Sequence, residues 1–344
     1  MKAGTRQPAR GNSKRKPEEK ERFLCAALCA MLFTVCSAAE AQSLKKIPVI
    51  GIFLPETAAT YASYNEAFVQ GLRELGYVLG RNLLLEYRYT EGKRERLPEL
   101  AAELVRLKVD MIVVTGGTLA AAKQATNTIP IVVATAGDLV GDGFIASLAR
   151  PGGNITGSSN LDSDLSGKRL ELLKESFPKT GRVAFLLWGG NKQDQDELKE
   201  TRTAAQRLAV RIQASDIKDP NQFPNAFSMI TKERSEAVIV TNNSFSFAHR
   251  KTIVDFAARN RLPTMFGRIG FVEDGGLMSY AASRHDLFRR TAYFVDKILK
   301  GANPGDLPVQ QPTKFEFAIN LKTAKQIGVT IPQSVLYRAD RVIK

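Results

Sequence analysis

Apolar runs of strand length alternate with segments in which apolar residues recur at helical spacing over most of the chain. Tyr64, Phe68 and Leu72, for example, predict an amphipathic helix that Gly76 ends. Further helices are expected at residues 97–104 and 119–125. In the first half of the chain the predicted strands cover residues 47–54, 83–89, 111–114, 129–134 and 154–157.

The same alternation begins again in the second half. Helices are expected over residues 197–208, around Phe223, Phe227 and Ile230, over 248–259, and over 286–299, where Gly301 ends the helix. The predicted strands cover residues 183–188, 210–214, 237–241, 263–266, 277–280 and 315–320. Strands that alternate with helices indicate parallel sheets with helices on both faces.

Two successive runs of about five strands predict two such sheets, and therefore an α/β protein of two similar, Rossmann-like lobes. The helix at 286–299 follows the second run, so we expect the chain to pass between the lobes more than once. The N-terminal lobe is predicted to contain residues 47–160 plus about 283–312. The C-terminal lobe is predicted to contain residues 161–282 plus about 313–344.

The N-terminal segment has a different pattern. An apolar run at residues 23–39 follows a basic stretch, ends in Ala39-Glu40-Ala41, and contains all three cysteines of the chain, Cys25, Cys29 and Cys36. This order predicts a secretory signal peptide over residues 1–41, with an uncleaved anchor helix as the alternative. The mature protein would then be periplasmic and free of disulfides, thiol nucleophiles and cysteine metal ligands.

The net charge of the whole chain is +14. The mature part keeps an excess of about +10, which could attract nucleic acid, anionic lipid or anionic solutes. No basic run is interleaved with aromatic residues, so nucleic acid is not an expected partner, and a dispersed solubilising charge is the favoured interpretation.

Ligands of open parallel sheets bind beyond the carboxyl ends of the strands. Residues 115–118, Thr-Gly-Gly-Thr, lie at such an end and precede a helix, so the free amides around Gly117 and Thr118 are candidates for holding a carboxylate or phosphate. A plain glycine turn with Thr118 as the N-cap is the alternative. Neither a Walker loop nor a GxGxxG fingerprint is present. The segments that follow the predicted strands are 55–61, 115–118, 135–138, 158–160, 188–191, 241–244, 267–270 and 280–283.

Other strand ends supply further candidates. Asp138 is suited to receive an ammonium or hydroxyl group, or else caps a turn. Thr241 and Asn242 offer donors and acceptors, or form an Asx turn. Arg268 is suited to bind an anion bidentately, or is a solvated surface arginine. Tyr280 is suited to stack on a ring, or packs in the core.

Signals for an enzyme are weak. Neither histidine, His249 or His285, has a second histidine at metal-binding spacing, and no G-x-S-x-G nucleophile elbow is present. We therefore expect no catalytic residue, no metal and no cofactor. Two carboxylate pairs are expected in polar turns, with solvation or helix capping as their role: Asp162/Asp164 and Asp194/Asp196.

Several stretches give the chain a family resemblance. It resembles substrate-binding proteins of ABC transporters, in the periplasmic-binding-like family that includes tryptophan/tyrosine-type binders. The block Pro-Gly-Gly-Asn-Ile-Thr-Gly at residues 151–157, within a longer stretch at 147–157, is the most specific. The others lie at residues 50–52, 71–77, 110–113, 129–132, 275–280, 306–309 and 320–325.

The resemblance implies two lobes joined by a hinge, as in type I periplasmic binding proteins, closing on a small organic ligand. It also implies delivery to an ABC permease driven by a cytoplasmic ATPase, and a monomer. By position, the residues that match ligand-contacting segments are Gly117, Thr118, Asp138, Thr241, Asn242 and Tyr280.

One departure from the family pattern concerns the ligand. The amino-acid-binding branch tends to carry acidic residues after the third and fourth strands of the second lobe, where this chain has Thr241-Asn242-Asn243 and Gly267-Arg268-Ile269. We therefore expect an anionic or aromatic acid in place of an ordinary amino acid. The alternative functions are an extracytoplasmic ligand-sensing domain and a secreted α/β hydrolase.

Overall fold

The computed structural model describes Met1, Gly4, and residues 46–188 and 192–344. The predicted signal peptide and the three cysteines lie outside these residues, apart from Met1 and Gly4. The chain divides into two compact units, Met1–Ile47 and Pro48–Lys344. Among the described residues, no helix is both long enough and apolar enough to cross a membrane.

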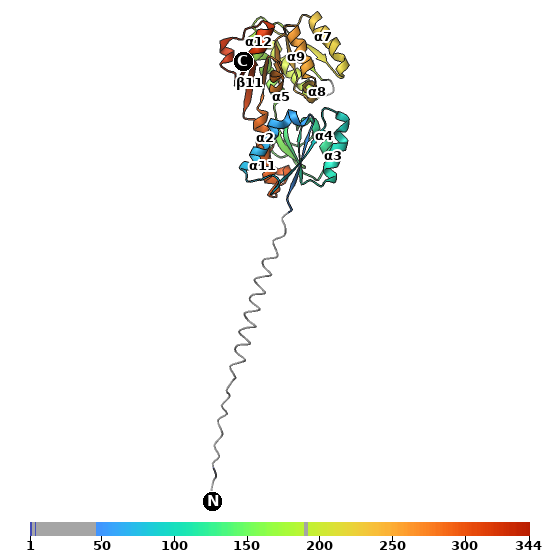
Figure 1. The fold of residues 1–344 in the computed structure, drawn as a ribbon, viewed down its shortest axis with the longest axis vertical. Helices are drawn as coiled ribbons and strands as arrows, with labels where there is room; N and C mark the ends of the chain where they lie inside the picture. The colour runs from blue at the N-terminus through green and yellow to red at the C-terminus, as the bar shows by residue number, and fades with distance from the viewer. Residues whose placement is uncertain (2–3, 5–45, 189–191) are drawn as a thin grey trace. The chain divides into compact units, whose positions relative to one another are not determined.

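The first sheet of the second unit has five strands, all parallel (Figure 1). Their spatial order is β2-β1-β3-β4-β5. The strands are β1 (Val49–Leu54), β2 (Leu84–Tyr89), β3 (Met111–Thr115), β4 (Ile131–Ala136) and β5 (Ile155–Ser159). Every residue of β3, β4 and β5 is buried. Strands β3 and β4 are inner strands covered on both faces. The edge strand β5 is covered along its outer side by the segment at Gln310, which exchanges backbone hydrogen bonds with Gly157 and Ser159.

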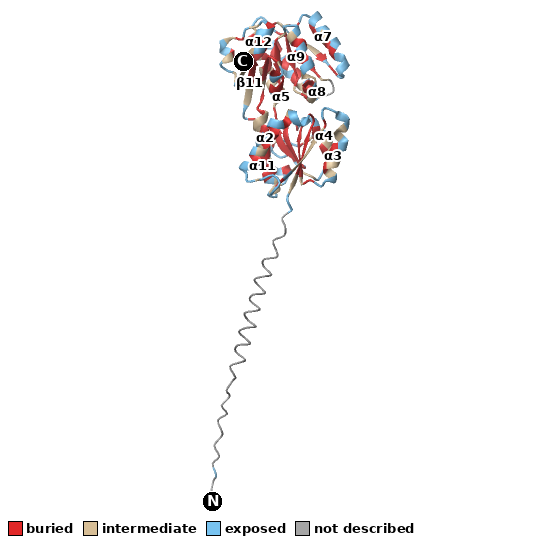
Figure 2. Ribbon diagram, viewed as in Figure 1, coloured by how far each residue is buried: buried red, intermediate tan, exposed pale blue. Residues whose placement is uncertain are grey.

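Helices cover both faces of this sheet. On one face, α2 (Ala58–Glu74) and α11 (Arg284–Leu299) pack together, and their apolar residues join those of β1 and β3 in one core. On the other face, α3 (Leu97–Arg106) and α4 (Gly116–Ala125) form a second core with β1, β3 and β4. Figure 2 shows how the buried residues concentrate on the strands and on the inner faces of the helices.

The second sheet has seven strands in the order β12-β11-β10-β9-β8-β6-β7. They are β6 (Arg182–Leu187), β7 (Arg211–Asp216), β8 (Ala237–Val240), β9 (Thr264–Phe266), β10 (Met278–Ala282), β11 (Phe315–Asn320) and β12 (Arg341–Ile343). Strand β11 runs antiparallel to β10, whereas the other neighbouring strands of this sheet are parallel, so the predicted parallel sheet is confirmed apart from this one pairing. After α11 the chain returns beside the last residue of β10, where Phe315 pairs with Ala282. Strand β11 therefore runs in the direction opposite to β10.

Helices also cover both faces of the second sheet, in two separate cores. The first core includes α5 (Asp162–Ser176), α6 (Lys192–Arg207), α12 (Leu321–Ile327) and α13 (Gln333–Leu336). The second includes α7 (Phe223–Lys232), α8 (Ser244–Ala248), α9 (Arg250–Arg259) and α10 (Ile269–Glu273). Short 3-10 turns lie at Arg94–Arg96, Pro220–Gln222 and Pro304–Asp306.

The predicted alternation of strands and helices is confirmed, whereas α5, α8, α10 and β12 were not predicted. Asp162 and Asp194 were expected in polar turns, either solvated or capping a helix. Asp162 begins α5 and Asp194 lies in the first turn of α6, so both are at helix starts, but both are buried and the expected solvation is wrong. The chain leaves the first sheet after β5, re-enters its helical layer at α11, and returns to the second sheet at β11. The predicted lobe boundaries stay a prediction.

Gly71 lies where α2 crosses α11. A Cβ atom there would approach the Arg289 backbone oxygen to 2.3 Å and the Ala292 Cβ to 3.0 Å. Alanine favours a helix interior by about 1 kcal/mol, but backbone cannot yield as a flexible side chain can. We predict that Gly71→Ala lowers the free energy of unfolding by about 1–3 kcal/mol in denaturant titrations. Gly153→Ala, where no atom lies within 4 Å of the added Cβ, is the control and is expected to leave it nearly unchanged.

Candidate functional site

The loops that follow the strands of the two sheets touch each other. Arg268, after β9, donates from Nη1 to Oε1 of Glu56, after β1, at 3.2 Å. Arg94, just beyond β2, places its guanidinium carbon 4.1 Å from the ring centre of Trp188, after β6. The carboxyl ends of both sheets therefore meet, and a ligand site is expected at this edge in open parallel sheets.

Arg268 is buried, with only 3% of its surface exposed, so the alternative of a solvated surface arginine is wrong. It occupies the N-cap position of α10. Its guanidinium carbon lies 3.4 Å from the ring centre of Phe247, which covers one face of the guanidinium plane. Phe247 and Glu56 thus hold the cation in one orientation.

The pairing of this cation is incomplete. Among the described residues, Nε and Nη2 of Arg268 and Oε2 of Glu56 are buried without a hydrogen-bond partner. Burial alone lowers the pKa of Arg268, but the charge and hydrogen bond of Glu56, together with Tyr61 and Tyr64, raise it overall, so the guanidinium stays charged. Burial, and next the charge of Glu56, raise the pKa of Tyr61, so this neighbour stays a neutral phenol.

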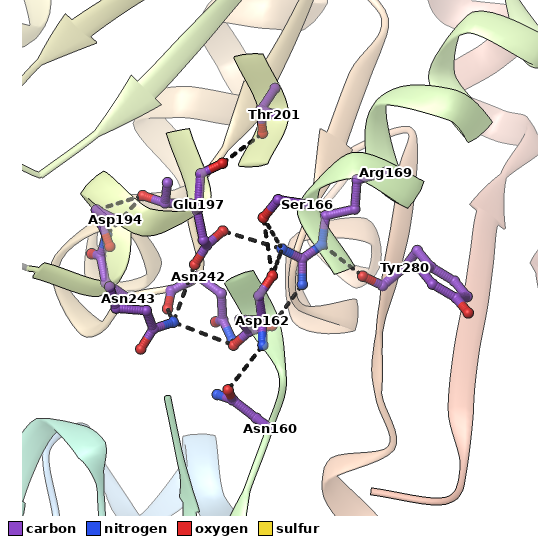
Figure 3. Close-up of polar contacts among 12 residues, drawn as sticks. Asn160, Asp162, Ser166, Arg169, Asp194, Glu197, Thr201, Asn242, Asn243 and Tyr280 are labelled. Carbon is purple, nitrogen blue, oxygen red and sulfur yellow. Dashed lines mark hydrogen bonds and ion pairs between the residues drawn. The ribbon is translucent and has the colours of Figure 1, made fainter. Parts of the chain in front are cut away.

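A second buried arginine, Arg169 on α5, has every side-chain nitrogen paired (Figure 3). Its Nη2 contacts Asp162 Oδ1 at 2.6 Å, and its Nη1 contacts Glu197 Oε2 at 3.1 Å. Its Nε donates to the Tyr280 backbone oxygen at 2.8 Å. Arg169 therefore ties α5 to α6 and to β10.

The same cluster fixes the loop after β8. Thr241 Oγ1 and Asn243 Nδ2 each donate to Asp194 Oδ2 at 2.6 Å. Asn242 Nδ2 donates to Asp162 Oδ2 at 2.7 Å. In Figure 3 the side chains of Asn242 and Asn243, from the loop, converge with those of Asp162 and Asp194, from the two helices. The predicted residues Thr241 and Asn242 are thus held by carboxylates that the sequence analysis had placed in turns.

Carboxylates outnumber the cation in this cluster, and their titration reflects it. Burial raises the pKa of Glu197 to about 8, although Arg169 lowers it. Burial also raises the pKa of Asp194 to about 6, although hydrogen bonds from Thr241 and other donors lower it. At a pH between their ordinary pKa values and these raised ones, Glu197 and Asp194 therefore hold protons in the folded protein that they release in the unfolded chain.

The predicted residues at the ends of β3 and β4 have different roles. Gly117 is exposed at the second position of α4, where an added Cβ would lie 2.8 Å from Ser244 Oγ. Thr118 is buried and donates to the Phe53 backbone oxygen at 2.8 Å, while Thr115 is the N-cap in its place. Asp138 is exposed, and its Oδ1 accepts from the backbone amides of two following residues, which is the turn-capping alternative.

Tyr280 contributes its backbone oxygen to Arg169, whereas its ring stacks on Phe315 at a centroid distance of 6.2 Å. The structure thus brings Thr241, Asn242 and the Tyr280 backbone together through the Arg169 cluster. Sequence reasoning missed the partners: Glu56, Asp162, Arg169, Asp194 and Glu197. One signal for a buried arginine was available in the sequence, since Arg169 directly precedes the apolar residues Leu170, Leu172 and Leu173, which are buried on the same helix.

Comparison with known proteins assigns a family. The description "ABC transporter substrate binding protein" matches residues 49–343, nearly all of the unit that carries both sheets. The chain belongs to this family. Substrate binding, for which the family is named, agrees with a ligand site where the strand ends of the two sheets meet. Within the described residues, no group of three or more His, Cys, Asp or Glu side chains is arranged to hold a metal ion.

Individual relatives agree with the family. A tyrosine-binding protein of Clostridioides difficile is 24% identical over 77% of this chain and 76% of its own. A conserved domain protein from Vibrio cholerae has 25% identity and a TM-score of 0.80 over 86% of this chain and all of its own. An ABC domain from Streptococcus pneumoniae in complex with L-Trp has 24% identity and a TM-score of 0.80, over 86% and 99%. Two of these relatives are described as a tyrosine-binding protein and as an ABC domain in complex with L-Trp.

The Arg169 cluster makes stability depend on pH. The folded-state pKa of Glu197 lies above the ordinary value of 4.5, so its protonation stabilises the fold at low pH, and this contribution is lost as pH rises from about 4.5 to about 8. We predict that the wild type loses at least about 1 kcal/mol more than Glu197→Gln between pH 5 and pH 8.

Urea unfolding at four pH values measures this difference in slope, which a change in absolute stability does not affect. Glu200→Gln, at an exposed position of the same helix, is the control and should follow the wild type. Parallel pH profiles for Glu197→Gln and the wild type would contradict the prediction.

Proposed function

We propose that this protein is the extracytoplasmic solute-binding component of an ABC importer and captures a small organic ligand by closure of its two lobes. The observation that carries the proposal is the contact between Arg268 and Glu56, which joins the strand ends of the two sheets through buried, incompletely paired charges. A ligand closes two lobes only through its preference for the closed state. Groups from both sheets that meet the same ligand supply such a preference.

The names of two relatives indicate the ligand class. One is a tyrosine-binding protein, and another was solved with L-Trp. We therefore propose a ligand of amino-acid size with an aromatic or organic acid character. Partners in transport would be a permease and its ATPase, with the protein acting as a periplasmic monomer after removal of residues 1–41.

We assign roles to the predicted site residues within this function. Arg268 contacts the ligand directly, and the backbone at Gly117 offers a close approach. Thr241 and Asn242 orient the loop after β8. The remaining ligand-site candidates, whose side chains or backbone bond within the protein, support the site from behind: Thr118, Asp138 and Tyr280.

The test is thermal unfolding of the exported protein, refolded free of ligand, against amino acids, aromatic acids, dicarboxylates, sugars and nucleosides. We predict that one chemical class raises the midpoint by a few degrees, because a ligand at a hundred times its dissociation constant adds about 2.7 kcal/mol. The same compound should lower the radius of gyration in solution scattering and be recovered unchanged. Chemical conversion of the compound would favour an enzyme, and no shift with any class would contradict solute capture.

A further inference from the structure

The two buried arginines differ in one respect. Arg169 is 1% exposed and Arg268 is 3% exposed, so both guanidinium groups are shielded from bulk solvent. All three nitrogens of Arg169 have protein partners, whereas Arg268 uses only Nη1. Buried polar groups are nearly always paired, so each exception requires an explanation.

The two unpaired nitrogens of Arg268 form one edge of its guanidinium plane. The N–H bonds of Nε and Nη2 on that side are nearly parallel and match the two oxygens of a carboxylate. The remaining directions are occupied, because Nη1 contacts Glu56 and Phe247 covers one face. The unpaired Nε–Nη2 edge is therefore complementary to a planar anion with two oxygens.

We infer that the ligand binds through a carboxylate placed side-on against the Nε–Nη2 edge of Arg268, with a hydrogen-bond donor beside it for Oε2 of Glu56. This inference rests on the proposed function and names the chemistry of its ligand. The second half follows from Glu56, whose Oε2 is buried without a hydrogen-bond partner among the described residues, although the Tyr61 phenol acts on the same carboxyl group. An α-amino or α-hydroxy acid carries both groups at adjacent atoms.

The charge at the site agrees with such a ligand. Arg268 and Glu56 neutralise each other, and Tyr61 stays uncharged because its pKa is raised. A zwitterion adds no net charge to this neutral pair. A hydroxy acid adds one negative charge. Arg284 and Glu316 line the same narrow pocket as Arg268 and offset each other in charge, and the buried Nε of Arg284, which has no partner among the described residues, is placed to donate to that acid.

A single water is the competing occupant. The pocket beside Arg268 has a volume of about 10 Å³, room for about one water molecule. A carboxylate therefore enters only when the loops that carry Glu56 and Arg268 separate and then close around it. A water would satisfy the same nitrogens without making the protein prefer acids, so preference for acids decides between the two.

The experiment compares matched ligands on the full exported protein by calorimetric titration. The probes are L-tyrosine, its hydroxy acid, its deamino acid, its carboxamide, and every acid from the unfolding screen beside its own carboxamide. We expect each carboxamide to bind roughly 10- to 100-fold more weakly than its acid, because it leaves a charged donor pair unmatched. This comparison uses the wild type alone and needs no variant to fold.

Variants then locate the effect. Arg268→Gln should abolish the preference for acid over amide, and Arg268→Lys should restore it only in part, because lysine keeps the charge and loses the fork. Arg250→Gln is the matched control, since Arg250 lies 4.4 Å from the same Phe247 ring but is partly exposed and bonds to Asp274. Glu56→Gln should weaken the amino or hydroxy acid and leave the deamino acid within a few-fold.

The outcomes separate this inference from the proposed function. Ligands that bind and close the lobes without preferring acid to amide, or with the preference intact in Arg268→Gln, overturn the inference and leave solute capture standing. Absence of binding by any compound, neutral or acidic, overturns both. Acid preference that Arg268→Gln removes and Arg250→Gln retains supports both.

Discussion

The ion pair of Arg169 with Asp162 and the hydrogen bond of Arg169 to Glu197 are the contacts on which the site depends. Removing charges from water costs several kcal/mol for each ion, and only close, well-directed partners compensate for it. Here the partners are close, at 2.6 and 3.1 Å. Because Asp162 follows β5 and Tyr280 lies near the end of β10, Arg169 braces two of the segments by which the chain leaves one sheet for the other. The geometry of the strand ends is thereby set from within the second sheet's own helices.

Polar residues of two kinds lie near the strand ends: those that bond to other protein groups, and those such as Arg268 that keep donors unpaired. Asp194 and Asp162 use their oxygens to hold Thr241, Asn243 and Asn242, so most of these side chains' bonding capacity is spent within the protein. Arg268 keeps an unpaired edge in the same region. A rigid, fully bonded shell around one incompletely bonded group is the arrangement expected of a preorganised binding site.

The sheets could be predicted well from the sequence because buried strands are local apolar runs such as Val49–Leu54. The ends of helices are likewise indicated by single residues such as Gly76, which has a positive φ. Sequence reasoning missed α5 because the inward positions of that helix carry Asp162, Ser166 and Arg169 where apolar residues are expected. It located Arg268 at a strand end but not its burial, because the partner Glu56 lies 212 positions away. Local patterns encode elements, whereas pairing between distant polar residues depends on the assembled fold.

The incomplete pairing of Arg268 also bears on selectivity. The protein has already lost the solvation of this cation on folding, and Phe247 and Glu56 have already oriented it. A carboxylate that binds as the loops close therefore gains charge-assisted bonds to a guanidinium that Phe247 keeps in one orientation. A neutral isostere leaves the buried donors unmatched, and a site built on such donors rejects it far more strongly than an apolar pocket rejects a misfit methylene. The same unpaired edge that weakens the ligand-free fold thus provides discrimination between an acid and its amide.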